Sequence, residues 1–537
     1  MRASHLNARA SFVALGTALL AVGVLPGIAG AQEAKRVDVT PYIGIDQGVT
    51  GPLKGEGDVL TYTNLSAGVS ASVQTRRVEA SIDVQYNHSF GWGRNASDQD
   101  VISGIVSGRI NLAQGLALNA GGLATRVRSD GLWGASTLRN SLTSQIFSGY
   151  IGPSYATRVG DFDLNASYRL GYTRVEDDFN SGYPGMSGGS FDDSVSHSLT
   201  GSVGFAPDTV LPRVGLVASA GYDREDARQL DQRFENAWGR VDATVPVTPT
   251  VALVGGIGYE DIQISQRSPL LDEDGIPVIR NGRYVTDKGS PRALIYESDG
   301  IIWDAGVLWR PSQRTSLQAR IGRRYGGTTF SGTFVWEGRN ASFGLAVFDG
   351  IESFGRLMTS DVAALSGSNL DVIRNPFTGD LAGCAFSVTG GGQCFNDALT
   401  GITDANFRYR GVSAQFARHF GRWTWGLGAG YSQRKFITPE GEAVFVSGTR
   451  DQNWYGNMSA SYAINDRSGI NTVAYISRFD ASGARSDVWN MGAFTSYYTS
   501  LTRRLSASAS VGVDGVKSDE IDTIISAMGQ VGMRYSF

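Results

Sequence analysis

Residue types that could carry out catalysis are sparse in this sequence. Downstream of residue 31, the histidines are His88, His197 and His419. A hydrolase needs a His held close to a nucleophile or a carboxylate, and no motif links any of the three to a Ser nucleophile. We therefore expect ordinary histidines on strand surfaces and a protein that is not an enzyme.

The cysteines are the second candidate for chemistry. Cys384 and Cys394 stand in the longest polar loop of the sequence. In a secreted chain this spacing favours a disulfide bond, with free thiols or metal and redox chemistry as the alternatives. A metal site would need further ligands, and no His stands nearby. The string Gly426–Gly430 lacks the spacing of a nucleotide-binding loop. We therefore expect neither a metal nor a cofactor.

The N-terminus has the pattern of a secretory signal. Arg2 and Arg9 precede an apolar stretch, 12–25, and the small residues 29–31 fit a cleavage site. We expect a signal peptide over 1–31, cleaved before Gln32; an uncleaved anchor helix is the alternative. Cleavage removes two Arg and no acid, so the formal net charge moves from −4 to −6. Such an acidic chain is a poor partner for nucleic acid.

The period of the remaining sequence is two. In the segment 78–87, apolar residues alternate strictly with polar ones, and the same pattern occupies 64–74, 162–173 and 505–514. A strand places the two sets on opposite faces. A soluble β-sandwich alternates too, but its strands have about 5–6 residues, against about 10–14 here. No second apolar run of about 18 residues occurs, so only a closed barrel could cross a membrane.

The connections between these segments alternate in length. Short turns such as 75–77 alternate with long polar loops such as 265–296 and 352–401. Outer-membrane barrels have short periplasmic turns and long extracellular loops. We therefore predict that residues 32–537 form one all-β domain, a single antiparallel transmembrane barrel of about 20–22 strands, within a range of about 18–24. The pair 331–337 and 341–349 is the least distinct.

Charged residues on the inward face are where transport would be controlled. Alternation assigns eight of them to the lumen: Glu79, Asp83, Arg109, Asp163, Arg169, Arg320, Arg324 and Asp514. Each is confined there because a charge on the lipid face costs about 2–4 kcal/mol near the midplane. Mixed charges in a lumen orient and sort polar solutes. The alternative is that they pair with one another and only stiffen the wall.

The C-terminal strand carries an assembly signature. Apolar residues fall on every second position and the chain ends in Phe, which gives the series Val531, Met533, Tyr535 and Phe537. This resembles the signal by which outer-membrane barrels are passed to the barrel assembly machinery. The chain as a whole resembles the porin-like outer-membrane β-barrel family, and some members of such families accompany exopolysaccharide export. That resemblance implies an outer-membrane location, with membrane lipid and a polar solute or polysaccharide as partners; it indicates no oligomeric state.

Two other barrel families fit less well. The first strand candidate, 37–46, begins about six residues after the expected cleavage site, which leaves no room for the N-terminal plug domain of TonB-dependent receptors. An autotransporter would need a passenger before its barrel. The leading hypothesis is a porin-like pore for polar solutes. The alternatives are an exopolysaccharide secretion pore, although the rings that can be placed face lipid, and a non-transport barrel such as an adhesin or structural protein.

A barrel this wide needs something to narrow it. Barrels of about 16–18 strands already leave an aqueous channel, and barrels of about 22 are usually plugged. We hypothesise that the loop 352–401, the loop 265–296, or both, fold over or into the mouth. In the second loop, Val278–Val285 is typical of a hairpin around an Asn-Gly turn. Both loops could instead extend outward as surface decoration.

The disulfide can be tested directly. We expect non-reducing mass spectrometry of the purified protein to show the peptides of Cys384 and Cys394 cross-linked, because two cysteines in a secreted chain favour a disulfide. The bond would lower the entropy of the unfolded loop. Quantitative alkylation of both thiols without a reductant would contradict this expectation.

Overall fold

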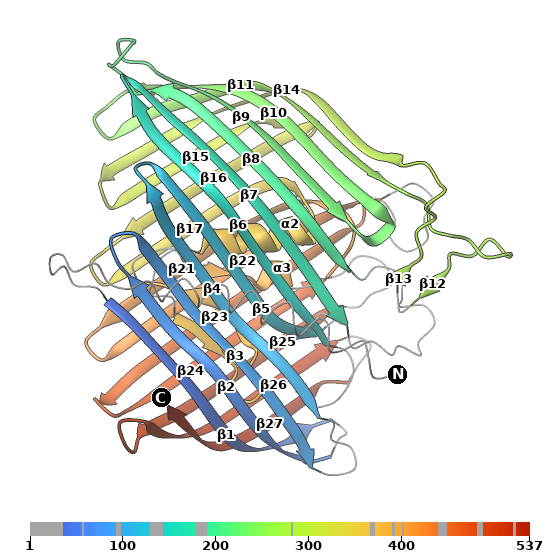
Figure 1. The fold of residues 1–537 in the computed structure, drawn as a ribbon, viewed down its shortest axis with the longest axis vertical. Coiled ribbons are helices and arrows are strands. Elements are labelled where there is room, and N and C mark those ends of the chain that lie inside the picture. The colour runs from blue at the N-terminus through green and yellow to red at the C-terminus, as the bar shows by residue number, and fades with distance from the viewer. Residues whose placement is uncertain are drawn as a thin grey trace. The chain divides into compact units, whose positions relative to one another are not determined.

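The alternating segments form one closed antiparallel sheet. In the computed structural model, 22 strands make a ring in which the last strand, β27 (Ile524–Ser536), pairs with the first, β1 (Arg36–Lys54). The closing ladder runs from Tyr42↔Ser536 to Lys54↔Ile525. Every other strand of the ring pairs with its neighbours in sequence (Figure 1). The predicted fold class, an all-β antiparallel barrel, is confirmed.

The other twenty strands of the ring fall close to the alternating segments. Those of the first half are β2 (Leu60–Gln74), β3 (Val78–Trp92), β4 (Gln99–Ala113), β5 (Leu116–Arg128), β6 (Thr143–Val159), β7 (Phe162–Asp177), β8 (Asp193–Phe205), β9 (Gly215–Ala227), β10 (Gln232–Pro246) and β11 (Val251–Gln266). Those of the second half are β14 (Ala293–Ser312), β15 (Thr315–Arg324), β16 (Gly327–Glu337), β17 (Ala341–Glu352), β21 (Asn406–Phe420), β22 (Trp423–Ile437), β23 (Arg450–Asn465), β24 (Ser468–Asp480), β25 (Val488–Ser500) and β26 (Leu505–Ser518).

The structure describes most, but not all, of the chain. The described residues are 36–55, 58–92, 98–128, 143–177, 191–280, 283–365, 371–388, 392–399, 402–438, 448–480, 487–518 and 522–537. The expected signal peptide, 1–31, lies outside them, so it and the domain boundary that follows stay predictions. Val37–Phe537 forms one structural unit.

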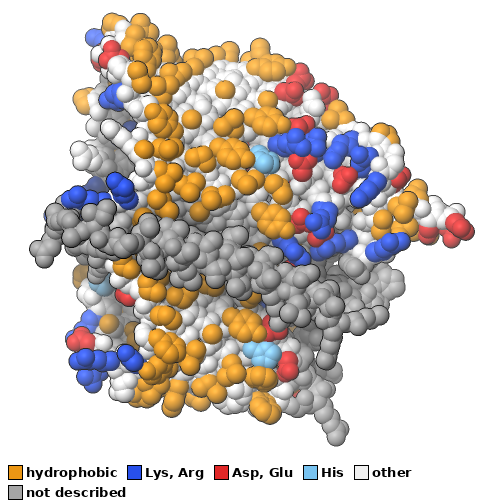
Figure 2. All heavy atoms as spheres, in the orientation of Figure 1, with side chains coloured by type: hydrophobic (Ala, Val, Ile, Leu, Met, Phe, Trp, Pro, Cys, Tyr) orange, Lys and Arg blue, Asp and Glu red, His pale blue; other side chains and the backbone are white. Residues whose placement is uncertain are grey.

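The outer face of the ring is apolar. Figure 2 shows hydrophobic side chains spread over the strands, while charged side chains gather toward the two ends of the strands. Many of these outward residues are largely exposed, among them Ile43, Leu199, Ile257, Ile321 and Val511. Among the described residues, no helix combines the length and the apolar character that a membrane span requires. These outward apolar side chains form a belt around the ring, as lipid contact requires of a transmembrane barrel.

Alternation along β3 fixes which of its side chains meet lipid. Asp83 bonds to Arg374, which belongs to the segment inside the ring described below, so Ile82 points the other way. We expect Ile82→Arg to reduce the yield of membrane-assembled, heat-modifiable barrel severalfold, since it places a charge on the lipid face.

The matched control for this substitution is Asp83→Asn, which changes the inward face of the same strand. It should leave assembly nearly intact. Equal yields for Ile82→Arg and Asp83→Asn in a membrane-fraction assay would show that the assigned faces are wrong.

Candidate functional site: a plugged lumen with a charged cavity

The described parts of the connection between β17 and β21, residues 353–365, 371–388, 392–399 and 402–405, lie in the barrel lumen. This plug segment, residues 353–405, contains α2 (Phe354–Ala364), β18 (Asp371–Arg374), β19 (Leu381–Phe386), β20 (Gln393–Cys394) and α3 (Asn396–Leu399). Helix α2 contacts β5 to β8, and α3 contacts β22 and β23, so the segment touches strands far apart around the ring (Figure 1). The loop predicted to enter or cover the barrel mouth therefore lies inside it.

Local secondary structure provides hydrogen-bond partners for many backbone N–H and C=O groups of the plug segment. Ser353 caps α2, accepting a hydrogen bond from the Arg356 backbone N–H at 3.2 Å. Strands β18, β19 and β20 form a small sheet in which Cys384 and Cys394 are register partners. These two residues form a disulfide. Buried backbone needs such pairing, so a loop of this length can occupy the lumen only by folding.

Polar side chains of the wall hold the plug from several sides. Arg374 forms an ion pair with Asp83 of β3, and Asp380 pairs with Arg126 of β5 at 3.2 Å. Wall side chains also donate to plug carbonyl oxygens at 2.6–3.2 Å, as Asn64 does to Phe377, Ser103 to Gly379 and Gln530 to Pro376. Ordinary hydrogen bonds contribute about 0.5–1.5 kcal/mol each and those to charged groups about 1.5–3, so together these contacts fix the position of the plug.

Apolar contacts complete the docking. Phe377 is fully buried among Val473, Phe494 and Met528 of β24, β25 and β27. A larger cluster joins α2 and the wall of β4 to β7; its members include Phe354, Leu357, Met358, Val362, Leu123, Ile146 and Val175. Truncating a buried Phe to Ala typically costs about 3–5 kcal/mol, so Phe377 alone contributes substantially.

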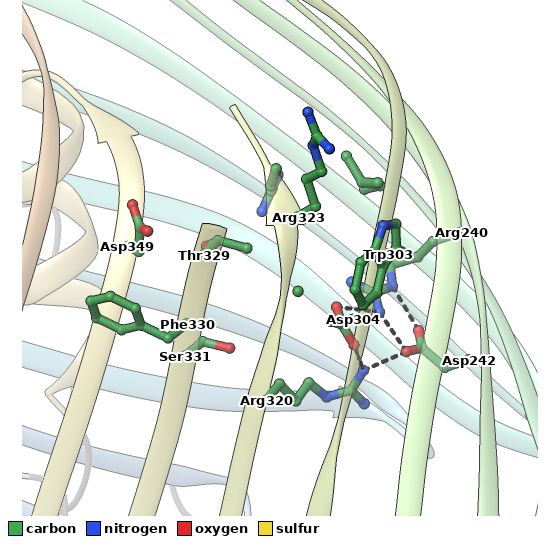
Figure 3. A pocket seen from close by; sticks show the side chains of 13 residues that line it. Arg240, Asp242, Trp303, Asp304, Arg320, Arg323, Thr329, Phe330, Ser331 and Asp349 are labelled. Carbon is green, nitrogen blue, oxygen red and sulfur yellow. Dashed lines mark hydrogen bonds and ion pairs between the residues drawn. The ribbon is translucent and has the colours of Figure 1, made fainter. Parts of the chain in front are cut away.

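Two adjoining cavities lie beside the plug, on the side of β7 to β17. The larger, of about 390 Å³, is bounded by Arg356, Thr359 and Ser360 of α2 and by side chains of β7 to β10. The smaller, of about 260 Å³, lies among β10, β14, β15, β16 and β17 (Figure 3). Arg240 and Arg324 line both cavities. Together they form a charged space that the plug does not fill.

The smaller cavity contains a square of two guanidinium and two carboxylate groups. Arg240 pairs with Asp242 at 2.7 Å and with Asp304 at 2.8 Å. Arg320 pairs with the same carboxylates, at 2.6 and 2.8 Å (Figure 3). Next to the square, Arg324 forms an ion pair with Glu260. The charges balance locally, so this wall presents paired dipoles rather than a field of one sign.

The wall is incomplete beside this square. The ladder between β16 and β17 ends at Gly332↔Val347, so residues 327–331 of β16 pair only with β15. The Thr328 carbonyl oxygen accepts hydrogen bonds from Arg408 and Arg410 of β21, at 3.1 and 3.0 Å. Both arginines also pair with Asp349 of β17. Side chains thus replace the missing backbone pairing along this seam.

The eight sequence-predicted lumen residues fall into three groups. Arg169, Arg320 and Arg324 line the cavities. Asp83 binds the plug, and Asp514 is buried. The other three lie away from the cavities: Glu79 and Arg109 are register partners on β3 and β4, and Asp163 pairs with Arg158 at 2.7 Å.

Several residues of this space escaped sequence reasoning. Arg240 and Asp242 alternate with Val241, so the period of two could have assigned them to the lumen. The expectation that aromatic rings face lipid is also incomplete, because Trp238 lines the larger cavity and the guanidinium of Arg356 lies 3.3 Å from the Phe234 ring centroid.

The described residues of the second candidate gate, loop 265–296, do not enter the lumen. Its hairpin consists of β12 (Ile279–Arg280) and β13 (Arg283–Tyr284), which pair as the Asn-Gly turn predicts, and in Figure 1 it projects beyond the ends of the barrel strands. Arg283 pairs with Asp192, before β8, at 2.8 Å. Of the described residues in the two hypothesised gates, those of the plug segment narrow the barrel and those of the outer hairpin do not.

The remaining candidate residues lie on the outer face or near strand ends. Val531, Met533 and Phe537 are exposed on β27 or just after it, and the Tyr535 ring packs edge-on against Phe537. Among the described residues, each histidine has a polar contact: His88 with Asp100, His197 with Tyr168 and His419 with Thr424. Within the described residues, no group of three or more His, Cys, Asp or Glu side chains could hold a metal ion.

Two carboxyl groups of the plug, Asp361 and Asp397, are buried and influence each other electrostatically. Asp361 of α2 accepts a hydrogen bond from Gln393 at 3.0 Å, and Asp397 of α3 accepts from Ser432 and Asn453 of the wall, each at 2.8 Å. Burial raises the pKa of Asp361 well above its ordinary value, and the Asp397 carboxylate raises that pKa further. Burial raises the pKa of Asp397 as well. Docking of the plug therefore favours the protonated carboxyls.

Comparison with known proteins finds only distant structural similarity to this chain. No protein-family model and no curated protein matches it. Similar solved structures include the FrpB iron transporter of Neisseria meningitidis in its apoprotein form, with 11% identity, a TM-score of 0.42 and coverage of 93% of this chain and 81% of that one.

Two further structures are similar at the same level. The ferric-catecholate import receptor Fiu of E. coli K12, in its closed form, has 10% identity, a TM-score of 0.42 and coverage of 92% and 81%. The copper transporter OprC has 9% identity, a TM-score of 0.41 and coverage of 95% and 82%. Identities and scores this low assign neither a cargo nor a family to this chain.

The carboxyl pair predicts a pH dependence. A raised pKa in the docked state means that docking takes up protons, so docking weakens as pH rises from about 4 through the raised values. We expect single-channel openings of the intact protein to become rarer as the pH is lowered from 7 toward the ordinary carboxyl pKa of about 4. Asp361→Asn should reduce this dependence, because it removes one titrating group. More frequent openings at pH 5, or an unchanged dependence in the variant, would contradict the expectation.

Proposed function

We propose that this chain is an outer-membrane channel for polar solutes, exported by the signal segment 1–31 and gated by its own plug segment. An apolar belt on a closed sheet of 22 strands supports the outer-membrane assignment, because such a sheet leaves no unpaired edge in lipid. The C-terminal series that ends in Phe537 supports hand-over to the barrel assembly machinery. Recovery of the protein in the outer-membrane fraction, with an N-terminus at Gln32, would test both statements.

The observation that carries the proposal is the charged space beside α2. It is bounded on one side by the wall of β7 to β10 and on the other by Thr359 and Ser360 of the plug. Paired charges of both signs line its continuation, including Arg320 with Asp304 and Arg324 with Glu260. A segment that only fills space needs no charged lining. A polar solute needs one, because charged groups replace the water that the solute loses on entering. Small outward movements of α2 would enlarge this space.

The plug sets the resting state of the channel. An open lumen in a barrel of about 22 strands would admit noxious solutes, and ion pairs such as Arg374–Asp83 keep the plug seated against the wall. Conduction therefore depends on how firmly the plug is docked. This role is the proposed reason for its disulfide, which keeps β19 and β20 together when the plug moves.

Deletion of residues 360–395 tests the proposal. In planar bilayers, the intact protein should show low conductance with rare openings. The deleted form should conduct severalfold more, because the deletion removes most of the plug segment. Liposome swelling with small sugars should increase in parallel.

The matched control is deletion of the outer hairpin, residues 276–287, which shortens a loop without emptying the lumen. It should leave conductance unchanged. A plug-deleted barrel that assembles, yet conducts no more than the intact protein or the hairpin-deleted form, would rule the plug out as the gate.

A further inference from the structure

Four polar side chains form a row across the wall of the larger cavity. Arg169 of β7 is the register partner of Ser198 of β8, Ser198 of Asp223 of β9, and Asp223 of Asn236 of β10. Register partners share a face and stand about 4.5–5.5 Å apart, so this polar row runs continuously around the barrel wall. All four residues line the cavity of about 390 Å³.

The charged groups of the polar row lack the ion-pair partners that those of the neighbouring square have. Within the part of the chain that the structure describes, neither Arg169 nor Asp223 takes part in a side-chain hydrogen bond or an ion pair. Asn236 is 7% exposed, and its Oδ1 atom is buried without a partner. A buried polar atom without a hydrogen bond is costly, so its persistence beside a cavity points to a ligand that completes it.

Trp238 gives the cavity a flat apolar surface. Its register partner is Gly221 of β9, and a Cβ atom on Gly221 would lie 2.5 Å from Cε2 of the indole. The indole therefore lies against the strand backbone, where only glycine leaves room. Trp238 also lines the cavity, and the indole N–H makes no hydrogen bond with the described residues. An aromatic ring laid along a wall beside planar polar groups presents a stacking surface.

We propose that this cavity is a binding site for a small neutral saccharide, an inference that rests on the proposed channel function and names its substrate class. Along the polar row, a donor (Arg169), a hydroxyl (Ser198), an acceptor (Asp223) and an amide (Asn236) succeed one another. Sugar hydroxyls both donate and accept, so neighbouring hydroxyls of one ring match this succession. The apolar C–H face of the ring stacks on Trp238.

Other ligand chemistries use fewer of these features. One unpaired guanidinium and one unpaired carboxylate leave the row without a net charge, so an anion would meet repulsion from Asp223. An amino-acid zwitterion would satisfy Arg169 and Asp223 but leave Asn236 and the ring of Trp238 without a partner. Ser360 of α2 lines the opposite side of the cavity, so a bound sugar reaches from the wall to the plug.

Isothermal titration calorimetry of the full-length protein purified in detergent tests the site. D-glucose and maltose are the probes, and glycine and inorganic phosphate are the comparison ligands. We expect saturable binding of at least one of the two sugars. Asp223→Asn and Trp238→Ala should each weaken it by about tenfold or more, as loss of a hydrogen bond to a charged group or of a stacking face does.

The controls are Asp261→Asn and Trp454→Ala, which change the same residue types away from the cavity and should bind sugar as the intact protein does. Heat-modifiable migration in gels shows that each variant has folded, and Asp223→Asn is nearly isosteric. No sugar binding, stronger binding of glycine or phosphate, or undiminished binding in both cavity variants would overturn the inference. Conductance of the plug-deleted barrel is measured separately, so failure of the sugar site and failure of the channel function are distinguishable.

Discussion

Closure of the sheet is the constraint on which the rest of the structure depends. Lipid offers no partner to a backbone N–H or C=O group, so β27 must pair with β1 along nearly its whole length. Closing a ring of 22 strands creates an interior wider than the wall side chains can fill. The chain fills part of that interior with residues 353–405 and lines the remainder with ion pairs. Plug and charged cavity are thus both consequences of strand number.

The interior combines two solutions to the burial of polar groups. Against β2 to β6 and β22 to β27, plug carbonyls and charges meet matched wall groups, as Gly379 meets Ser103 and Asp380 meets Arg126. Against β10 to β15, the wall residues satisfy one another, as in the square around Arg320. The polar row between these regions belongs to neither solution. The saccharide site proposed there would complete Asn236, whose Oδ1 atom is buried without a partner among the described residues.

The sequence predicts the strands of the barrel wall far better than it predicts the plug segment inside the lumen. Strict alternation in segments such as 78–87 is a local property, so it assigns Asp83 to the lumen without knowledge of any neighbour. The partner of Asp83 is Arg374, almost three hundred positions away, and no local pattern encodes that pairing. One signal for the plug was nevertheless present. Inward Gly426 and Gly428 leave space for Phe386 and the disulfide of the plug, since a Cβ atom at either position would lie within 2.7 Å of them.

The position of the plug in the chain links its docking to closure of the barrel. It follows β17, yet its contacts include early strands, through Asp83 and Arg126, and the last strand, through Gln530. No subset of the ring offers all of these groups at once, so the plug can dock fully only when β1 and β27 have paired. The docked plug in turn joins early and late strands across the lumen, where Phe377 packs between Val473, Phe494 and Met528 while its carbonyl accepts from Asn64. Seam and plug therefore support each other across the lumen.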